Sequence, residues 1–166
     1  FYENIIEKEQ ARQSDGNLLI YMISKSEVAG AVRNKIIQDL SCVSFSVGRT
    51  EVDQVYPPVS EWLRGFKDAE YVFTDSFHGC AFSIIFNKPF LIWGNKKTGV
   101  ARYQSLLNKL GLIDRLILDE KDYNPDIWNN PIDWKRVNNI IRGKKRDQSN
   151  FFAIILAKHT KALKRV

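Results

Sequence analysis

The stretch YVFTDSFHGCAFSIIFNKPF, residues 71–90, decides the fold of this chain. It opens with three apolar residues flanked by polar ones, which predicts a short buried strand over 71–73. The segment from Cys80 to Phe86 is almost wholly apolar and ends in an Asn-Lys-Pro turn, which predicts a buried helix over about 77–87. A strand that passes into a helix through a short polar turn is typical of α/β proteins.

The same alternation continues on both sides of this segment. Further strands are predicted over 17–24 (with Met22 inside), 42–47, 89–93 and 115–118. Further helices are predicted over 1–13, 27–40, 100–110, 133–142 and 150–164, and one more begins after Ser60 as its N-cap. Gly111 is the predicted C′ residue of the helix over 100–110, and Gly143 is predicted to separate the last two helices. Strands that alternate with helices imply parallel pairing and right-handed crossovers, so we expect a doubly wound, mainly parallel, Rossmann-like α/β sheet followed by C-terminal helices.

The size of the chain suits one domain within a longer protein. Its 166 residues are 44% hydrophobic, which is enough for a substantial core. The chain begins without an initiator methionine, inside a predicted helix. We expect 1–16 to be a linker or helix from a missing N-terminal half, 17–131 to be the Rossmann-like domain, and 132–166 to be basic helices that pack on the domain or cross to the missing half.

The positive charge is concentrated at the C-terminal end. The net charge is +6, and residues 142–166 hold eight basic residues against Asp147 alone, so the tail carries +7 and the remainder −1. Such a tail suits a membrane surface, a nucleic acid or an acidic neighbouring domain, and a solvated helix end is an equally good interpretation. Nucleic-acid modules interleave aromatic and basic residues on one face, whereas this tail groups its charges at its ends, so no nucleic-acid partner is expected.

Metal, redox and membrane-spanning functions find no support in the sequence. Cys42 and Cys80 lie in apolar segments without metal or redox spacing, and only two histidines are present. We expect reduced thiols, a cytoplasmic location, and neither a metal nor a cofactor. No apolar run approaches the roughly 20 residues of a membrane span.

His78 is the candidate catalytic residue. In open α/β sheets ligands bind at the carboxyl ends of the strands, where the segment 74–79 is expected to lie, as are Ser24-Lys25, Gly48-Arg49 and 94–99. A helix N-terminus offers free N–H groups and partial positive charge to an anion. A histidine in that first turn can contact the anion and move a proton; the alternative is a structural histidine that bonds a loop carbonyl.

Two further features of this edge are expected to shape the site. Asp75 or Ser76 is the natural N-cap of the helix. Small groups spaced three, four and four residues apart form a stripe that would let a ligand or neighbouring backbone approach closely: Ser76, Gly79, Ser83 and Asn87.

Arg102 is the second candidate. It follows the 94–99 loop and lies off the apolar stripe of its own helix, so its guanidinium could hold a carboxylate or phosphate. A solvated surface arginine is as good an interpretation. Lys96 and Lys97 in the same loop could form a cationic lid, although surface charge is the simpler interpretation.

The sequence PPVSEWLRGFKDAEYVFTDSFHGCAFSIIFNKPFLIW (57–93), followed by RYQSLLNKLGL (102–112), closely resembles the C-terminal half of the polysaccharide pyruvyl transferase family. The similarity runs from about Asn17 to Arg115. The resemblance implies two Rossmann-type halves facing each other, as in GT-B glycosyltransferases. It also implies transfer of pyruvate from phosphoenolpyruvate to a sugar as a cyclic ketal, in capsular or exopolysaccharide synthesis.

Carried over residue by residue, the resemblance makes His78 the catalytic or donor-contacting histidine. It makes the following residues the donor-binding set: Thr74, Ser76, Phe77, Gly79, Lys96 and Arg102. It implies that 17–131 binds the donor, that the missing half shapes the site of the glycan or lipid-linked sugar acceptor, and that this half alone folds but is inactive. The basic tail would then contact the inner membrane face.

Two other functions stay open on sequence alone. One is the nucleotide-sugar-binding half of a GT-B glycosyltransferase, which needs an acidic residue for the ribose hydroxyls. The other is a non-catalytic α/β recruitment module that docks through the apolar residues of the tail: Phe151, Phe152, Ile154, Ile155 and Leu156.

Overall fold

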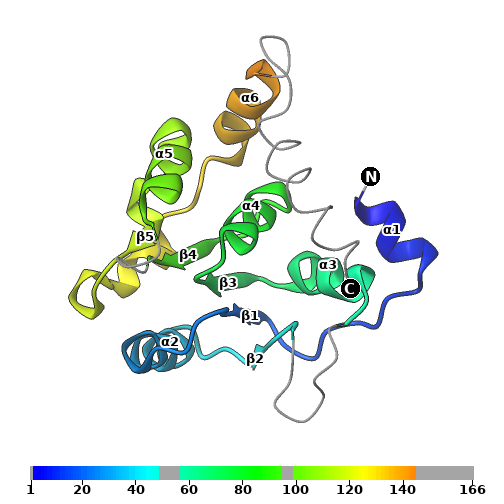
Figure 1. Ribbon diagram of the computed structural model, residues 1–166, viewed down its shortest axis with the longest axis horizontal. Helices are drawn as coiled ribbons and strands as arrows, with labels where there is room; N and C mark the ends of the chain where they lie inside the picture. Colours follow the sequence, from blue (N-terminus) through cyan, green and yellow to red (C-terminus); the bar gives the residue numbers. More distant parts are fainter. Residues whose placement is uncertain (1, 49–56, 95–98, 145–166) are drawn as a thin grey trace. The chain divides into compact units, whose positions relative to one another are not determined.

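A computed structural model describes residues 2–48, 57–94 and 99–144 (Figure 1). The chain divides into two units, residues 1–132 and 133–166. In the second unit the described part contains one helix, α6 (Trp134–Lys144). Everything that follows about the sheet and the site concerns the first unit.

The first unit is built on a five-stranded parallel sheet with the order β2-β1-β3-β4-β5. The strands are β1 (Leu18–Tyr21), β2 (Ser44–Phe45), β3 (Tyr71–Thr74), β4 (Phe90–Trp93) and β5 (Leu116–Ile117). The predicted doubly wound α/β fold is therefore confirmed.

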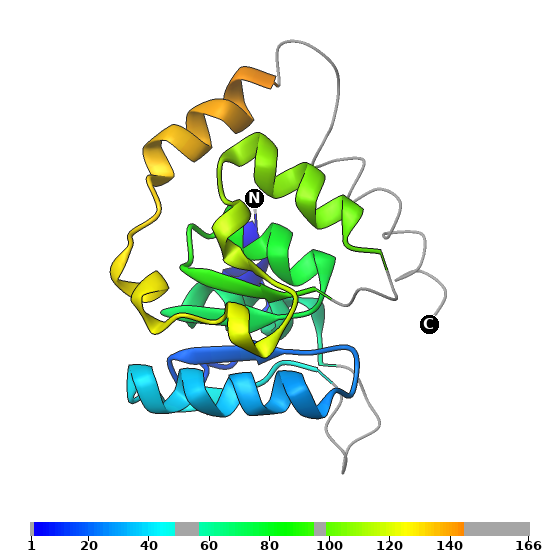
Figure 2. The same cartoon turned by 90° about the vertical axis from the view of Figure 1, so that its left-hand side faces the viewer.

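Helices cover both faces of the sheet, and Figure 2 shows α2 on one side with α4 and α5 on the other. The helices of this unit are α1 (Tyr2–Lys8), α2 (Glu27–Leu40), α3 (Val59–Asp68), α4 (Phe77–Ile85) and α5 (Ala101–Leu110). Short 3-10 turns lie at Ile113–Arg115, Glu120–Asp122 and Pro125–Asn129. The core on the α2 side joins alternate strand residues such as Leu18 and Phe73 to Val32 and Ile36, which share one face of α2.

Strand β4 shows why the sequence folds this way. All four of its residues are buried, as expected of a central parallel strand covered on both faces. Helix α4 is similarly enclosed, with six buried residues among its nine. The apolar stretch that predicted the fold therefore forms its centre.

Several predicted boundaries are wrong. Helix α1 ends at Lys8, and β1 ends at Tyr21, so that Met22 lies in the following loop. Pro58, with φ −51° and ψ 149°, is the N-cap of α3, and Ser60 lies inside the helix. Because the fixed φ of proline is compatible with the start of a helix, α3 begins two residues earlier than predicted.

The predicted break at Gly143 is also wrong, because α6 continues through it to Lys144. Glycine lowers helix stability by only about 1 kcal/mol relative to alanine and ends a helix only when it adopts the left-handed conformation. Gly111, with φ 66°, does adopt that conformation and ends α5 as predicted. The predicted helix over 150–164 lies outside the described residues.

The strand order reverses direction at one position. The chain moves from β1 outward to β2 and then returns past β1 to β3. The loops that follow β1 and β3 therefore diverge to opposite faces, which is the topological switch point where ligands bind in open α/β sheets. These two loops are Met22–Ser26 and Asp75–Ser76.

Candidate functional site

Thr74 and Gly79 shape the turn from β3 into α4. The Thr74 hydroxyl donates to the Tyr21 carbonyl (2.5 Å) and accepts from the Ser76 N–H (3.0 Å), and its side chain is fully buried. A Cβ placed on Gly79 would lie 2.3 Å from Thr74 Oγ1, so no larger residue fits there. Both residues therefore hold the loop in place against the end of β1.

Ser76 is the N-cap of α4, as predicted, although its side chain makes no capping hydrogen bond. The hydroxyl is buried, with the residue 1% exposed, and it has no hydrogen-bond partner among the described residues. A buried polar group without a partner usually costs about 1–3 kcal/mol. Such a group at a helix N-terminus is suited to an anion, because the hydroxyl can donate to it.

His78 lies in the first turn of α4, two residues after the N-cap Ser76, and is partly buried. Phe77 precedes it and is also partly buried. The structure thus places the imidazole beside the N-terminus of a buried helix, where the sequence predicted it.

Helix α5 places Arg102 close to the first turn of α4. The Arg102 guanidinium carbon lies 5.1 Å from the centre of the Phe77 ring and 5.3 Å from that of Tyr103. Stacking on two rings leaves the edge of the guanidinium available to bind an anion. The exposed Arg102 side chain is therefore fixed near the first turn of α4.

Tyr103 completes this link, and sequence reasoning assigned it only to the apolar stripe of its helix. Its hydroxyl donates to the Asp75 carbonyl (2.7 Å). Burial raises the pKa of Tyr103, against the lowering effect of Arg102, so the phenol remains a donor at neutral pH. An aromatic residue directly after the candidate arginine was the only sequence signal for this role.

Asp75 was the alternative to Ser76 for the N-cap of α4, and the structure gives it another role. It does not cap α4; its carboxylate accepts from the Ile23 N–H (2.6 Å), the Ser24 N–H (2.9 Å) and the Ser24 hydroxyl. Three donors converge on one carboxylate because the strand order places the end of β1 beside the end of β3. Asp75 therefore joins the two loops of the switch point.

Three residues of the predicted stripe, Ser76, Gly79 and Ser83, pack inside the protein, whereas Asn87 is exposed beyond the end of α4. Ser83 is fully buried and donates to the Gly79 carbonyl (2.7 Å), while Gly79 faces Thr74. The group that packs closely against this stripe is the side chain of Thr74, and not a neighbouring backbone.

A cavity of about 850 Å³ lies at the carboxyl ends of β1 and β2. Its walls come from the end of β1, the loop after it, the first turns of α2 and the residues that directly follow β2, including Tyr21, Ser24, Gly30 and Gly48. The sequence placed Ser24-Lys25 and Gly48 at this edge, but it gave no indication of a cavity there.

A sequence profile of the polysaccharide pyruvyl transferase family matches residues 4–97, which is more than half of the chain. The chain belongs to the polysaccharide pyruvyl transferase family. No curated protein and no solved structure shows a significant match to it. The pyruvyl transferase match covers Thr74, Ser76 and His78 and stops before Arg102, whereas the similarity was expected to run from about 17 to 115.

Some residues that the sequence analysis singled out lie outside the described part of the chain. Lys96 and Lys97 are among them, as are Arg49 and most of the basic tail, including the apolar residues 151–156. Within the described ranges, no three His, Cys, Asp or Glu side chains are grouped to hold a metal ion. Each helix in these ranges is too short or too polar to span a bilayer.

Cys80 follows directly after the turn. It is fully buried, and burial raises the pKa of its thiol well above the usual range. A thiol that stays protonated is a poor nucleophile. The chemistry available at this edge therefore comes from the imidazole, hydroxyl, guanidinium and backbone N–H groups.

Proposed function

We propose that this chain is the donor-binding half of an enzyme that transfers pyruvate from phosphoenolpyruvate to two hydroxyls of a sugar, giving a cyclic ketal and phosphate. The observation that carries the proposal is the buried hydroxyl of Ser76, which has no partner among the described residues and lies at the N-terminus of α4, two residues before His78. Phosphoenolpyruvate is a small, highly charged anion, and a helix N-terminus with an unsatisfied donor is a suitable receptor.

In this proposal the donor's two anionic groups are held separately. Ser76 and the free N–H groups of the first turn of α4 bind the phosphate, and Thr74 and Gly79 keep that turn in position. Arg102, stacked on Phe77, binds the carboxylate through its guanidinium edge. Lys96 is proposed as a further contact to the donor.

His78 acts as the general acid. It gives a proton to the methylene carbon of the enol, which leaves a cationic centre at C2 for the first sugar hydroxyl to attack. Cleavage of the C2–O bond then releases phosphate, and the second hydroxyl closes the ketal. The two protons lost by the hydroxyls balance the proton gained by the new methyl group and the one carried by hydrogen phosphate. A positioned acid of this kind typically contributes on the order of 10²–10⁴-fold.

We further propose the cellular setting that the family suggests. The chain would pair with a second Rossmann-type half in a GT-B-like layout and act on a lipid-linked glycan in capsular or exopolysaccharide synthesis, in the cytoplasm. The basic tail would hold the enzyme at the anionic inner membrane face.

The test is phosphate release from phosphoenolpyruvate by the full-length protein in the presence of sugar acceptors. We expect His78→Ala to lower kcat by about 10²–10⁴-fold. The other histidine of the chain supplies the matched control, and His159→Ala should leave kcat unchanged. Full activity in His78→Ala, or binding of UDP in preference to phosphoenolpyruvate, would contradict the proposal.

A further inference from the structure

We infer that the cavity at the carboxyl ends of β1 and β2 binds the sugar acceptor, an inference that rests on the proposed function. The donor groups proposed above lie on the other side of the β3–α4 turn, where α5 brings Arg102 to Phe77. The cavity lies on the β1 and β2 side of that turn. The Asp75–Ser76 turn, which leads into the helix that carries His78, would then separate the donor from the acceptor.

The size of the cavity favours the larger substrate. Pockets of roughly 300–1,000 Å³ hold ligands much larger than a three-carbon acid. At about 850 Å³, the cavity has more room than phosphoenolpyruvate needs and is large enough for one or more sugar rings.

The lining also suits a polyhydroxylated ligand. A sugar hydroxyl both donates and accepts hydrogen bonds, so its receptor must offer both kinds of group. The cavity wall contains three serine hydroxyls, two cationic side chains, one carboxylate and the amphipathic ring of a tyrosine: Ser24, Ser26, Ser46, Lys25, Arg33, Glu27 and Tyr21.

Asp75 fixes this wall relative to the catalytic turn. Its carboxylate holds the backbone of Ile23 and Ser24, both of which line the cavity, while its own backbone leads directly to Ser76 and α4. Thr74 makes a second connection through the Tyr21 carbonyl. The loop after β1 and the turn after β3 are therefore held together. This connection would fix the position of the acceptor relative to the His78 imidazole.

Gly30 permits a test that does not depend on damaging the fold. It lines the cavity from α2, and a Cβ built on it meets no atom within 4 Å. Leucine in place of glycine fills part of the cavity and also raises helix propensity. We therefore expect Gly30→Leu to leave the melting temperature unchanged or raise it. Gln38→Leu, at an exposed position of the same helix outside the cavity, is the matched control.

The experiment is hydrogen exchange of the full-length protein with two probes added separately: phosphoenolpyruvate, and a mixture of the methyl glycosides of glucose, galactose, mannose and their N-acetylated amino sugars. We expect the glycosides to protect peptides that cover 22–30, and phosphoenolpyruvate to protect those that cover 76–82. Gly30→Leu should lose the first effect and keep the second, and Gln38→Leu should keep both.

Steady-state kinetics give a second readout. Gly30→Leu should raise KM for the protecting glycoside by at least about tenfold and leave KM for phosphoenolpyruvate within about twofold. The inference is overturned if no glycoside protects 22–30, or if Gly30→Leu binds the glycoside as its parent does. Absence of protection over 76–82 by phosphoenolpyruvate would instead count against the proposed donor site, so the two failures are distinguishable.

Discussion

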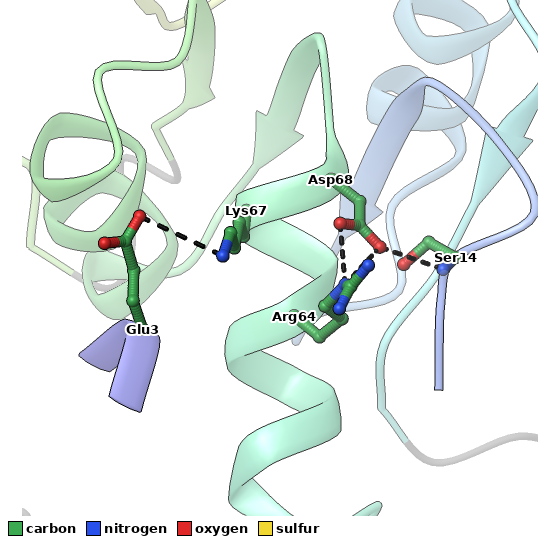
Figure 3. Close-up of polar contacts among 5 residues, drawn as sticks. All are labelled: Glu3, Ser14, Arg64, Lys67 and Asp68. Carbon is green, nitrogen blue, oxygen red and sulfur yellow. Dashed lines mark hydrogen bonds and ion pairs between the residues drawn. The ribbon is translucent and has the colours of Figure 1, made fainter. Parts of the chain in front are cut away.

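At both the amino-end and the carboxyl-end edge of the sheet, an aspartate carboxylate connects the segments next to β1 and β3. The two edges differ in which polar groups are left without a partner among the described residues. At the amino-end edge, the Asp68 carboxylate accepts from the Ser14 N–H (3.0 Å) and also pairs with Arg64 Nε (2.7 Å), as Figure 3 shows. At the carboxyl-end edge, the Asp75 carboxylate accepts from two backbone N–H groups, but no described cation forms an ion pair with it.

The amino-end edge is closed by further internal contacts. The Asn17 carbonyl accepts from the Glu70 and Tyr71 N–H groups, and the Asn17 side chain accepts from the Val43 N–H (3.0 Å). Each of these groups has its partner within the chain. The other edge carries the cavity and the Ser76 hydroxyl, for which the described part of the chain provides no partner. The contrast is the one expected if the carboxyl-end edge carries the proposed binding site.

Replacing the two carboxylates tests this contrast with the largest expected effect. Asp75→Asn and Asp68→Asn each remove charge-assisted hydrogen bonds, so both should lower the free energy of unfolding by about 1–3 kcal/mol. Only Asp75→Asn should also lower kcat/KM, by about tenfold or more, because only that tie positions the proposed site. Urea unfolding and steady-state kinetics on both variants provide the measurement. Equal kcat/KM in the two variants would refute the contrast.

A pair of buried serines sharpens the comparison within α4. Ser76→Ala removes a hydroxyl that has no described partner, so the free energy of unfolding should not fall, while the affinity for phosphoenolpyruvate should fall about fivefold to tenfold. Ser83→Ala removes the hydrogen bond to the Gly79 carbonyl and should cost about 1 kcal/mol of stability. Its affinity for the donor should not change. Calorimetric titration and denaturant unfolding would show whether the two effects separate as expected.

The smallest effect is expected at the exposed ion pair of the amino-end edge. Lys67 Nζ lies 4.0 Å from Glu3 Oε1, and both side chains are partly exposed (Figure 3). Such pairs contribute about 0–1 kcal/mol, so Lys67→Ala should change the free energy of unfolding by less than about 0.5 kcal/mol and leave kinetics unaltered. A loss of activity in this variant would show that the amino-end edge also takes part in function.

The sequence was sufficient to predict the parts of the site that are local. The positions of Ser76, His78 and Gly79 follow from one strand, one turn and one helix read in order. The fold class followed from the same alternation repeated along the chain. Periodicity and turn chemistry act between residues that are near in sequence, which is why these predictions hold.

The ties between distant segments could not be predicted in the same way. Asp75 meets Ile23 only because β3 pairs directly with β1, and strand order is a property of the whole sheet. Sequence reasoning could therefore offer Asp75 only a local role, as the alternative to Ser76 for the N-cap of α4. The reach of Tyr103 to the Asp75 carbonyl and the cavity beside Gly30 depend equally on packing between elements.

The most direct measurement is a crystal structure of the full-length protein with phosphoenolpyruvate. The account predicts the phosphate within hydrogen-bonding distance of Ser76 Oγ at the N-terminus of α4, with the carboxylate on Arg102 and the methylene carbon facing His78. Donor bound elsewhere in the protein, with the Ser76 hydroxyl still without a partner, would contradict it.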